Sequence, residues 1–163
     1  MSMNPQFNSF KKQITHPIKY RLFMLSKLPM GFISGLKIEH LSVEQSSISV
    51  KFMWVNQNPF RSIYFAVLSM AAELSTGLLS FGQIYKRQSQ VSMLVIKCEA
   101  TFLKKATGKI IFTCNDGNKI ENAIEQTLTT GEGVIIQAAS IGKNNNDEDV
   151  AKFLFTWSFK AKK

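Results

Sequence analysis

The chain has 163 residues, 45% of them hydrophobic and 19% charged. This balance is typical of one globular domain with a packed core and excludes a disordered chain. Twenty Lys and Arg against eleven Asp and Glu give a formal net charge of +9. The excess suits an anionic partner such as nucleic acid, an anionic membrane surface or a phosphate-bearing small molecule, although a basic surface without a partner has the same composition.

Metal and disulfide chemistry have little support in the sequence. There are two His and two Cys, and neither Cys lies in a CxxC pattern, so we expect no metal site and no cofactor of that kind. Cys98 and Cys114 lie equally far from Ala106, and a hairpin turning there would place them side by side. Reduced thiols on strands are the interpretation that we favour.

The N-terminal segment is basic and amphipathic. The first 38 residues hold six Lys or Arg and no Asp or Glu, and no apolar signal core precedes them, so we expect a cytoplasmic protein. The spacing over residues 7–28 predicts one or two helices interrupted at Pro17. We expect a cap over residues 1–30 that packs on the domain, while a transit peptide or a membrane-surface helix remains the alternative. The residues available for packing are Phe7, Phe10, Ile14, Leu22, Leu25 and Leu28.

A β-hairpin is predicted next, over residues 35–57, because apolar residues alternate in two bursts around the polar stretch EQSS. A long helix is predicted after it, from about Pro59 to Leu79 or Phe81, with Asn58 as N-cap. This segment is apolar nearly all round, so it is either buried or in a membrane. Its Glu73, serines and glycines, and the strands on both sides, favour the core of a domain without stable membrane insertion.

Strand patterns resume over residues 91–106, 107–116, 132–142 and 151–162, with a short helical or irregular excursion over 118–131. The order is therefore helix, two strands, one long buried helix and about four strands. One apolar helix wrapped by one curved antiparallel sheet satisfies this pattern, because the helix and the inner face of the sheet bury each other. The predicted fold class is α+β.

Glu73 is the only charged residue between Ser62 and Tyr85. Burying a carboxylate is expensive unless it has a partner, so Glu73 either points to a wet crevice or meets a donor from elsewhere. The free N–H groups at the start of the same helix form a candidate anion or oxyanion site. Ala66 and Glu73 lie on one face, roughly 10 Å apart along the axis. Two such helices, antiparallel across a dimer axis, would bring the start of one to the glutamate of the other.

These residues carry a resemblance to a known family. The chain resembles the hotdog-fold thioesterase superfamily near its phenylacetyl-CoA-thioesterase-like branch, and within it an uncharacterised group of proteins described as thioesterases. Many members show N-x-x-G-x-x-H-G-G and an acid nine residues after the His. In this chain the matching positions, in that order, are Asn58, Arg61, Tyr64, Phe65, Ala66 and Glu73.

The resemblance implies one hotdog domain over residues 1–163, with the cap over 1–30 and the hotdog core over 31–163. It implies a homodimer, or a tetramer, that hydrolyses acyl-CoA or another acyl thioester, with CoA only as part of the substrate. A backbone N–H at Phe65 or Ala66 would polarise the thioester carbonyl, the facing subunit's Glu73 would act as general base or nucleophile, and Asn58 would orient the water. The remaining candidates for substrate contact are Tyr64, Arg61, Thr76, Lys86, Arg87, Lys104 and Lys105.

The chain departs from the family pattern at three points. The paired glycines are Phe65 and Ala66, the His is Tyr64, and the first Gly is Arg61. These departures leave a second function open, that of an acyl-CoA or lipid-binding protein without turnover. A nucleic-acid-binding protein is a third, weaker interpretation of the basic and aromatic C-terminal residues, and we expect no nucleic-acid partner.

Overall fold

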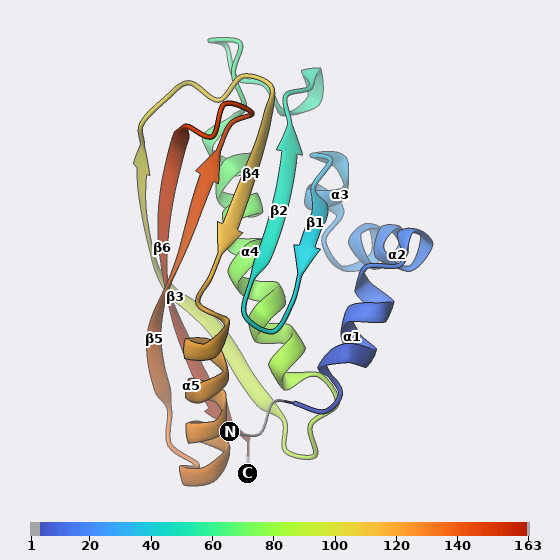
Figure 1. Ribbon diagram of the computed structural model, residues 1–163, viewed down its shortest axis with the longest axis vertical. Coiled ribbons are helices and arrows are strands. Elements are labelled where there is room, and N and C mark those ends of the chain that lie inside the picture. The colour runs from blue at the N-terminus through green and yellow to red at the C-terminus, as the bar shows by residue number, and fades with distance from the viewer. Residues whose placement is uncertain (1–3, 163) are drawn as a thin grey trace.

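The computed structural model describes residues 4–162, so Met1, Ser2, Met3 and Lys163 of the expected single domain lie outside the described part. One curved antiparallel sheet wraps a central helix, as predicted (Figure 1). The strands are β1 (Lys37–Leu41), β2 (Ser46–Lys51), β3 (Val91–Phe102), β4 (Lys109–Cys114), β5 (Val134–Lys143) and β6 (Asp149–Ala161). The helices are α1 (Phe7–Ile14), α2 (Pro17–Lys27), α3 (Pro29–Ile33), α4 (Phe65–Ile84) and α5 (Gly117–Thr130), with a 3₁₀ turn η1 (Trp54–Asn56).

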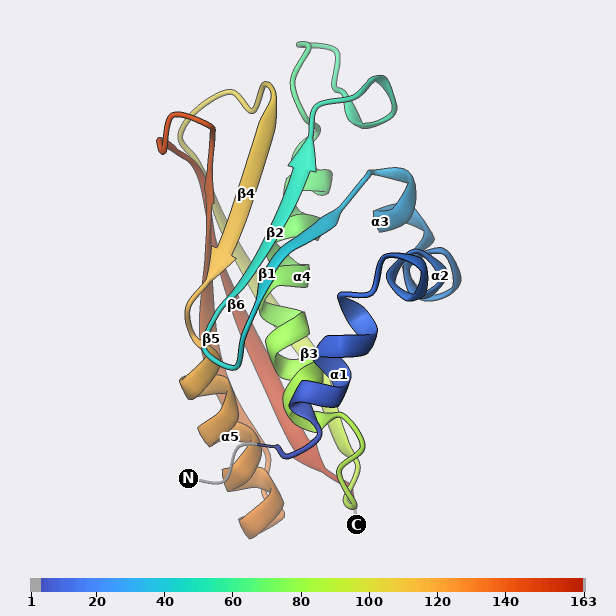
Figure 2. The same ribbon diagram turned by 45° about the vertical axis from the view of Figure 1, so that its right-hand side comes forward.

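Helix α4 forms the centre of the core. Figure 2 shows it between the sheet on one side and the N-terminal helices α1 to α3 on the other. Its apolar residues contact the inner faces of β2, β4, β5 and β6. By length and composition α4 could cross a membrane, but 61% of that stretch is buried inside the domain. The apolar character of α4 is therefore explained by its place in the core, as the sequence predicted.

The start of α4 differs from the prediction. The helix begins at Phe65, not at Pro59, and Tyr64 is its N-cap. Residues 58–61 form a turn in which the Arg61 N–H donates to the Asn58 carbonyl (3.0 Å). Pro59 fits the second position of such a turn as well as the first position of a helix, because both need the same φ. Arg61 has a φ of 57°, which ends any helix that would begin at Pro59.

The strand order is β1-β2-β4-β5-β6-β3, with every pair antiparallel. The hairpin predicted over residues 35–57 is confirmed as β1 and β2. The hairpin that would have joined Cys98 to Cys114 is wrong, because β5 and β6 lie between β3 and β4. Both cysteines are free, Cys98 exposed and Cys114 buried. The excursion over 118–131 is a regular helix, α5, which ends at Gly131 with a φ of 73°.

The N-terminal helices divide into a packed part and an exposed part. Phe7, Phe10 and Ile14 of α1 are buried, as expected for a cap. A Cβ at Gly82 of α4 would lie 2.4 Å from the Phe7 ring, so glycine provides the space for that ring. The other expected contacts are wrong. Leu22, Leu25 and Leu28 are 61%, 55% and 39% exposed, because the inward side of α2 is formed by Tyr20, Phe23 and Met24 instead.

Candidate active site

Glu73 lies on the side of α4 that the sheet does not cover. The carboxylate lines a cavity of about 250 Å³ between α4 and the segment that joins α2 to α3. Among residues 4–162 it forms no ion pair. Burial without a compensating charge raises the pKa of Glu73 above its ordinary value of 4.5. A carboxylate with a raised pKa beside a cavity is the form that a general base takes.

The walls of this cavity are mainly apolar. Met70 and Leu74 of α4 face Leu28, Pro29 and Met30 across it. A Cβ at position 77 would lie 3.2 Å from Glu73 Oε1, so Gly77 leaves room for the carboxylate on its own helix. Lys27 is the other charged residue of the lining, so the cavity suits an apolar group with polar groups beside it. The wall contributed by residues 27–31 has no local sequence signal, because it depends on how the cap folds back onto α4.

The start of α4 presents two backbone donors. Val67 N–H already donates to the Tyr64 carbonyl (2.9 Å), but Phe65 and Ala66, the first two helical residues, have no backbone or side-chain acceptor among residues 4–162. The loop that holds them is fixed by hydrogen bonds from Ile63 N–H to Ala106 O (2.9 Å) and from Tyr64 N–H to Asn56 O (2.8 Å). These are the N–H groups that the resemblance implies as oxyanion donors.

Asn58 lies close to this helix start but its side chain is occupied. Its Oδ1 accepts from the N–H groups of Phe60 (3.0 Å) and Ser62 (3.2 Å), and its Nδ2 donates to Ser62 Oγ (3.0 Å). The side chain therefore closes the turn, and the expectation that it orients a water molecule has no support in this geometry. Asn58 thereby holds the turn that leads into α4.

The side chains around the helix start are largely apolar. Tyr64 and Phe65 are 46% and 55% exposed and meet edge to face, with ring centroids 4.9 Å apart. Phe65 also meets Phe102 at the end of β3 edge to face, with ring centroids 6.2 Å apart. Arg61 is exposed on the turn. The structure thus places Arg61, Tyr64, Phe65 and Ala66 together at one end of α4, as the motif predicts.

Thr76 does not face the cavity. It is fully buried, its hydroxyl accepts a hydrogen bond from Trp157 Nε1 (3.0 Å), and it donates to the Glu73 carbonyl (2.9 Å). Both capacities of the hydroxyl are used inside the core, so nothing in this geometry supports the expected contact with a substrate.

The four basic candidates lie at two ends of the molecule. Lys104 and Lys105 follow β3, and the same loop bonds the start of α4 through Ala106. Lys86 and Arg87 follow the last residue of α4, at the other end of the helix (Figure 1). Arg87 pairs with Glu125 and Lys104 pairs with Glu148. One substrate molecule cannot contact both groups in one protomer, because α4 separates them by roughly 30 Å.

Solved structures resemble the whole chain. A protein of unknown function from Pseudomonas aeruginosa, described as a probable thioesterase, superposes with a TM-score of 0.75 at 18% identity, over 92% of this chain and 99% of that one. The chain has the hotdog fold. A protein of unknown function from Chlorobaculum tepidum matches the hotdog domain with a TM-score of 0.74 at 15% identity, over 93% and 99% of the two chains. A thioesterase from Haemophilus influenzae gives 0.63 at 13% identity, over 86% and 88%.

These identities make the likeness one of fold, and they confirm the hotdog architecture expected from the motif. Sequence comparison adds no further relationship, since no family model and no curated protein matches the chain. The Pseudomonas aeruginosa and Chlorobaculum tepidum proteins are each covered over 99% of their length.

Proposed function

We propose that the protein hydrolyses acyl-CoA or a related acyl thioester as a homodimer. The observation that carries the proposal is Glu73, a carboxylate without an ionic partner in the described chain that lines a mainly apolar cavity on the helix whose first N–H groups are free. Two of the structural neighbours, those from P. aeruginosa and H. influenzae, are described as thioesterases, which supports the same chemistry.

The distance between the two halves of the site requires a second subunit. Ala66 and Glu73 are about 10 Å apart on one helix, too far for one thioester group to contact both. In an antiparallel pair of α4 helices, the start of one helix faces the partner's Glu73, and Ser69 lies near the two-fold axis. Ala66, Ser69 and Gly77, which are half-buried along this side of α4, are small enough for two helices to approach.

The proposed reaction uses one water molecule. The N–H groups of Phe65 and Ala66 polarise the thioester carbonyl, and the partner's Glu73 takes a proton from water as the water oxygen attacks the carbonyl carbon. The tetrahedral intermediate collapses, the carbon–sulfur bond breaks, and the thiolate receives the proton that Glu73 holds. The products are a carboxylic acid and a thiol. Lys104 and Lys105, at the helix start, are the basic residues placed to meet CoA phosphates.

A subunit-mixing experiment tests this arrangement. Glu73→Gln removes the base, and Phe65→Pro removes one donor at a position where proline is tolerated, because Tyr64 before it is extended (ψ 136°). Each variant alone is expected to lose about 10²–10³-fold in turnover. An equal mixture, after subunit exchange, is expected to regain about one quarter of wild-type turnover, because half of the dimers contain one intact site.

The outcomes separate the alternatives. A mixture that stays as inactive as its components means that each site lies within one chain, or that no dimer forms. A wild type that binds acyl-CoA but releases no thiol from a panel of acyl thioesters would favour the acyl-binding function over hydrolysis.

A further inference from the structure

The exposed side of α2 carries a stripe of large apolar residues. Ile18, Leu22 and Leu25 are 65%, 61% and 55% exposed. At 3.6 residues per turn these three positions fall within about 60° of one another on the helix surface. They are not in the core, and no described element covers them. A solvated helix face normally carries polar residues, so the stripe calls for a partner.

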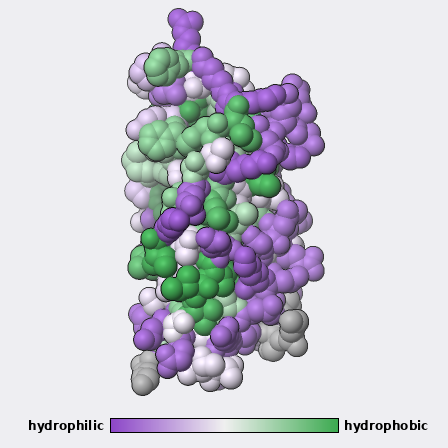
Figure 3. All heavy atoms as spheres, turned by 90° about the vertical axis from the view of Figure 1, so that its left-hand side faces the viewer, coloured by the Kyte–Doolittle hydropathy of each residue, from purple (hydrophilic) through white to green (hydrophobic). Residues whose placement is uncertain are grey.

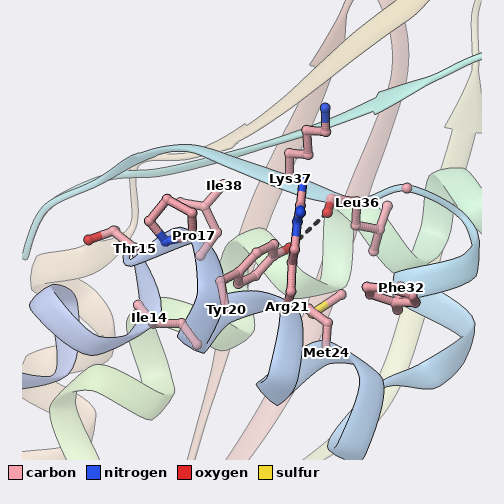
Figure 4. Close-up of a pocket in the computed structure, with 11 residues that line it drawn as sticks. Ile14, Thr15, Pro17, Tyr20, Arg21, Met24, Phe32, Leu36, Lys37 and Ile38 are labelled. Atoms are coloured by element: carbon pink, nitrogen blue, oxygen red, sulfur yellow. Dashed lines mark hydrogen bonds between the residues drawn. The ribbon is translucent and has the colours of Figure 1, made fainter.

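The surroundings of the stripe are basic. Lys19 and Arg21 flank it on its two sides, and neither forms an ion pair among residues 4–162. No Asp or Glu occurs in the first 38 residues. Arg21 also lines a cavity of about 540 Å³ between α2 and β1, and Lys37 of β1 is among the residues on its opposite wall (Figure 4). An apolar stripe between cations, beside a cationic cavity, is complementary to acyl chains under a layer of phosphates.

We propose that α2 docks the protein on an anionic phospholipid bilayer, with the axis of α2 parallel to the surface and Ile18, Leu22 and Leu25 inserted below the headgroups. A second copy of the chain is a poorer occupant of this face. A two-fold contact places the same patch against itself, so Lys19 and Arg21 would meet the same cations of the other copy. A bilayer supplies both the apolar layer and the opposite charge.

The α2 stripe lies next in the chain to the Glu73 cavity. The chain that leaves α2 carries Leu28 and Met30, 39% and 61% exposed, and both line that cavity. The proposed docking face is therefore continuous along the chain with one wall of the candidate site. Docking itself does not rest on the proposed hydrolysis.

Co-sedimentation with vesicles tests the proposal. The wild type is expected to sediment with vesicles of phosphatidylglycerol and phosphatidylcholine, to bind phosphatidylcholine vesicles more weakly, and to be released by high salt. Ile18→Ser/Leu22→Ser/Leu25→Ser is expected to lower the partition coefficient at least about tenfold. A matched control, Trp54→Ser/Val55→Ser/Phe60→Ser, removes three exposed apolar residues from the segment between β2 and α4 and is expected to bind like the wild type.

Charge-reversal variants provide a second test in the same vesicle experiment. Lys19→Glu/Arg21→Glu is expected to abolish the preference for anionic vesicles, whereas Lys51→Glu/Lys160→Glu, with the same change of net charge on exposed strand positions, is expected to retain most of it. The stripe variant should melt at the wild-type temperature, because its altered side chains are exposed. It should also hydrolyse a water-soluble short-chain thioester at the wild-type rate, so the vesicle result is independent of catalysis.

Three results would overturn the proposal. The first is a wild type that binds neither kind of vesicle, or binds both equally. The second is a stripe variant that sediments as the wild type does. The third is a stripe variant that forms a smaller assembly than the wild type in solution, which would make the stripe a contact between copies of the chain.

Discussion

The backbone conformation of Arg61 explains why the related motif has Gly at this position. Its φ of 57° lies in the left-handed region, where a Cβ meets the following carbonyl and where glycine has no such penalty. The related motif places Gly at the position that Arg61 occupies. The shape of the turn is thus kept in this chain although the residue has changed, and the strained backbone is stabilised by the hydrogen bonds of Asn58.

Replacing Arg61 with Gly should stabilise the protein. We expect a gain of about 0.5–1 kcal/mol in the free energy of unfolding, since relief of the left-handed strain exceeds the added entropy of glycine in the unfolded chain. Urea denaturation measures this gain in the free energy of unfolding. Lys105→Gly is the control, because Lys105 is not among the residues with positive φ, and this variant should be neutral or less stable. Equal effects of the two substitutions would contradict the conformational explanation.

Glu73 should make stability depend on pH. Its pKa is raised in the folded state, so the folded protein holds a proton that the unfolded chain has released, and wild-type stability falls as the pH rises from 4.5 through the raised pKa. Glu73→Gln stays neutral at every pH. We expect the variant to melt above the wild type at pH 7–8, with the difference vanishing below pH 4.5. A variant that melts lower at pH 7 would show that Glu73 has a cationic partner.

At the level of single elements, sequence periodicity predicted most of the fold. The hairpin, the central helix and the later strands follow from alternation and apolar runs that match how these elements are buried. The start of α4 did not follow, because Asn58 and Pro59 satisfy a turn and a helix start equally well and only the φ of Arg61 distinguishes them. The excursion over 118–131 was ambiguous because its polar residues obscure the buried stripe of Ile120, Ala123, Ile124 and Thr127.

The α2 helix shows a second limit of prediction from the sequence. An amphipathic pattern states that a helix has an apolar side, not what covers it. Phe7 and Phe10 on α1 are buried while Leu22 and Leu25 on α2 are exposed, although we expected both pairs to pack. The apolar residues of α2 are spread more evenly around the helix than those of α1, so its pattern does not say which side turns inward. The direction that the chain takes after Pro17 decides the outcome, and no local pattern encodes that direction.

Two substitutions in the N-terminal segment should therefore differ strongly. Phe10→Ala removes a side chain that is 3% exposed and contacts Phe81 and Tyr85, and should cost about 3–5 kcal/mol. Leu25→Ala, on the exposed stripe, should change stability by less than about 0.5 kcal/mol. Thermal denaturation of both variants measures the contrast. If the two substitutions lower the stability equally, the packing of α1 on α4 does not hold the N-terminal helices in place.

At the scale of the whole molecule, the two edges of the sheet differ. One edge is β1, a short strand with a bulge between Ile38 and His40, beside α2. The other edge is β3, which is much longer and has no neighbouring strand on its outer side within residues 4–162. Figure 3 shows apolar side chains gathered on the face over β3, β5 and β6. Leu94, Ile96 and Ile135 are 62%, 49% and 61% exposed there. Such an edge invites pairing with another strand.

We expect a dimer in solution that covers the half-buried side of α4, with Ala66, Ser69 and Gly77, and the β3 edge. Light scattering should give twice the protomer mass of 18.4 kDa at micromolar concentration. The melting temperature should rise with protein concentration, because dissociation accompanies unfolding. Removing the α2 stripe should leave this mass unchanged. If the measured mass is that of one protomer at all concentrations, a site shared between two subunits is ruled out.

The candidate site was predictable only where its residues lie close together in the sequence. Glu73, Phe65 and Ala66 follow from one helix and one motif, and the structure places them on the side of α4 that the sheet leaves open. The roles of Asn58 and Thr76 depend on contacts with Ser62 and Trp157, which a spacing cannot reveal. The cavity beside Glu73 depends on the return of residues 27–31 from a different part of the chain.

The position of β6 also sets the timing of assembly during synthesis. β6 lies between β5 and β3, so β3 finds its partner strand only after residues 149–161 have been made. At ~5–20 residues per second, β3 leaves the ribosome several seconds before that. During this interval a strand rich in Val, Leu, Ile and Met has both edges open and no sheet to join. The delay leaves the edges of β3 open to mispairing with other nascent chains until β6 has been made.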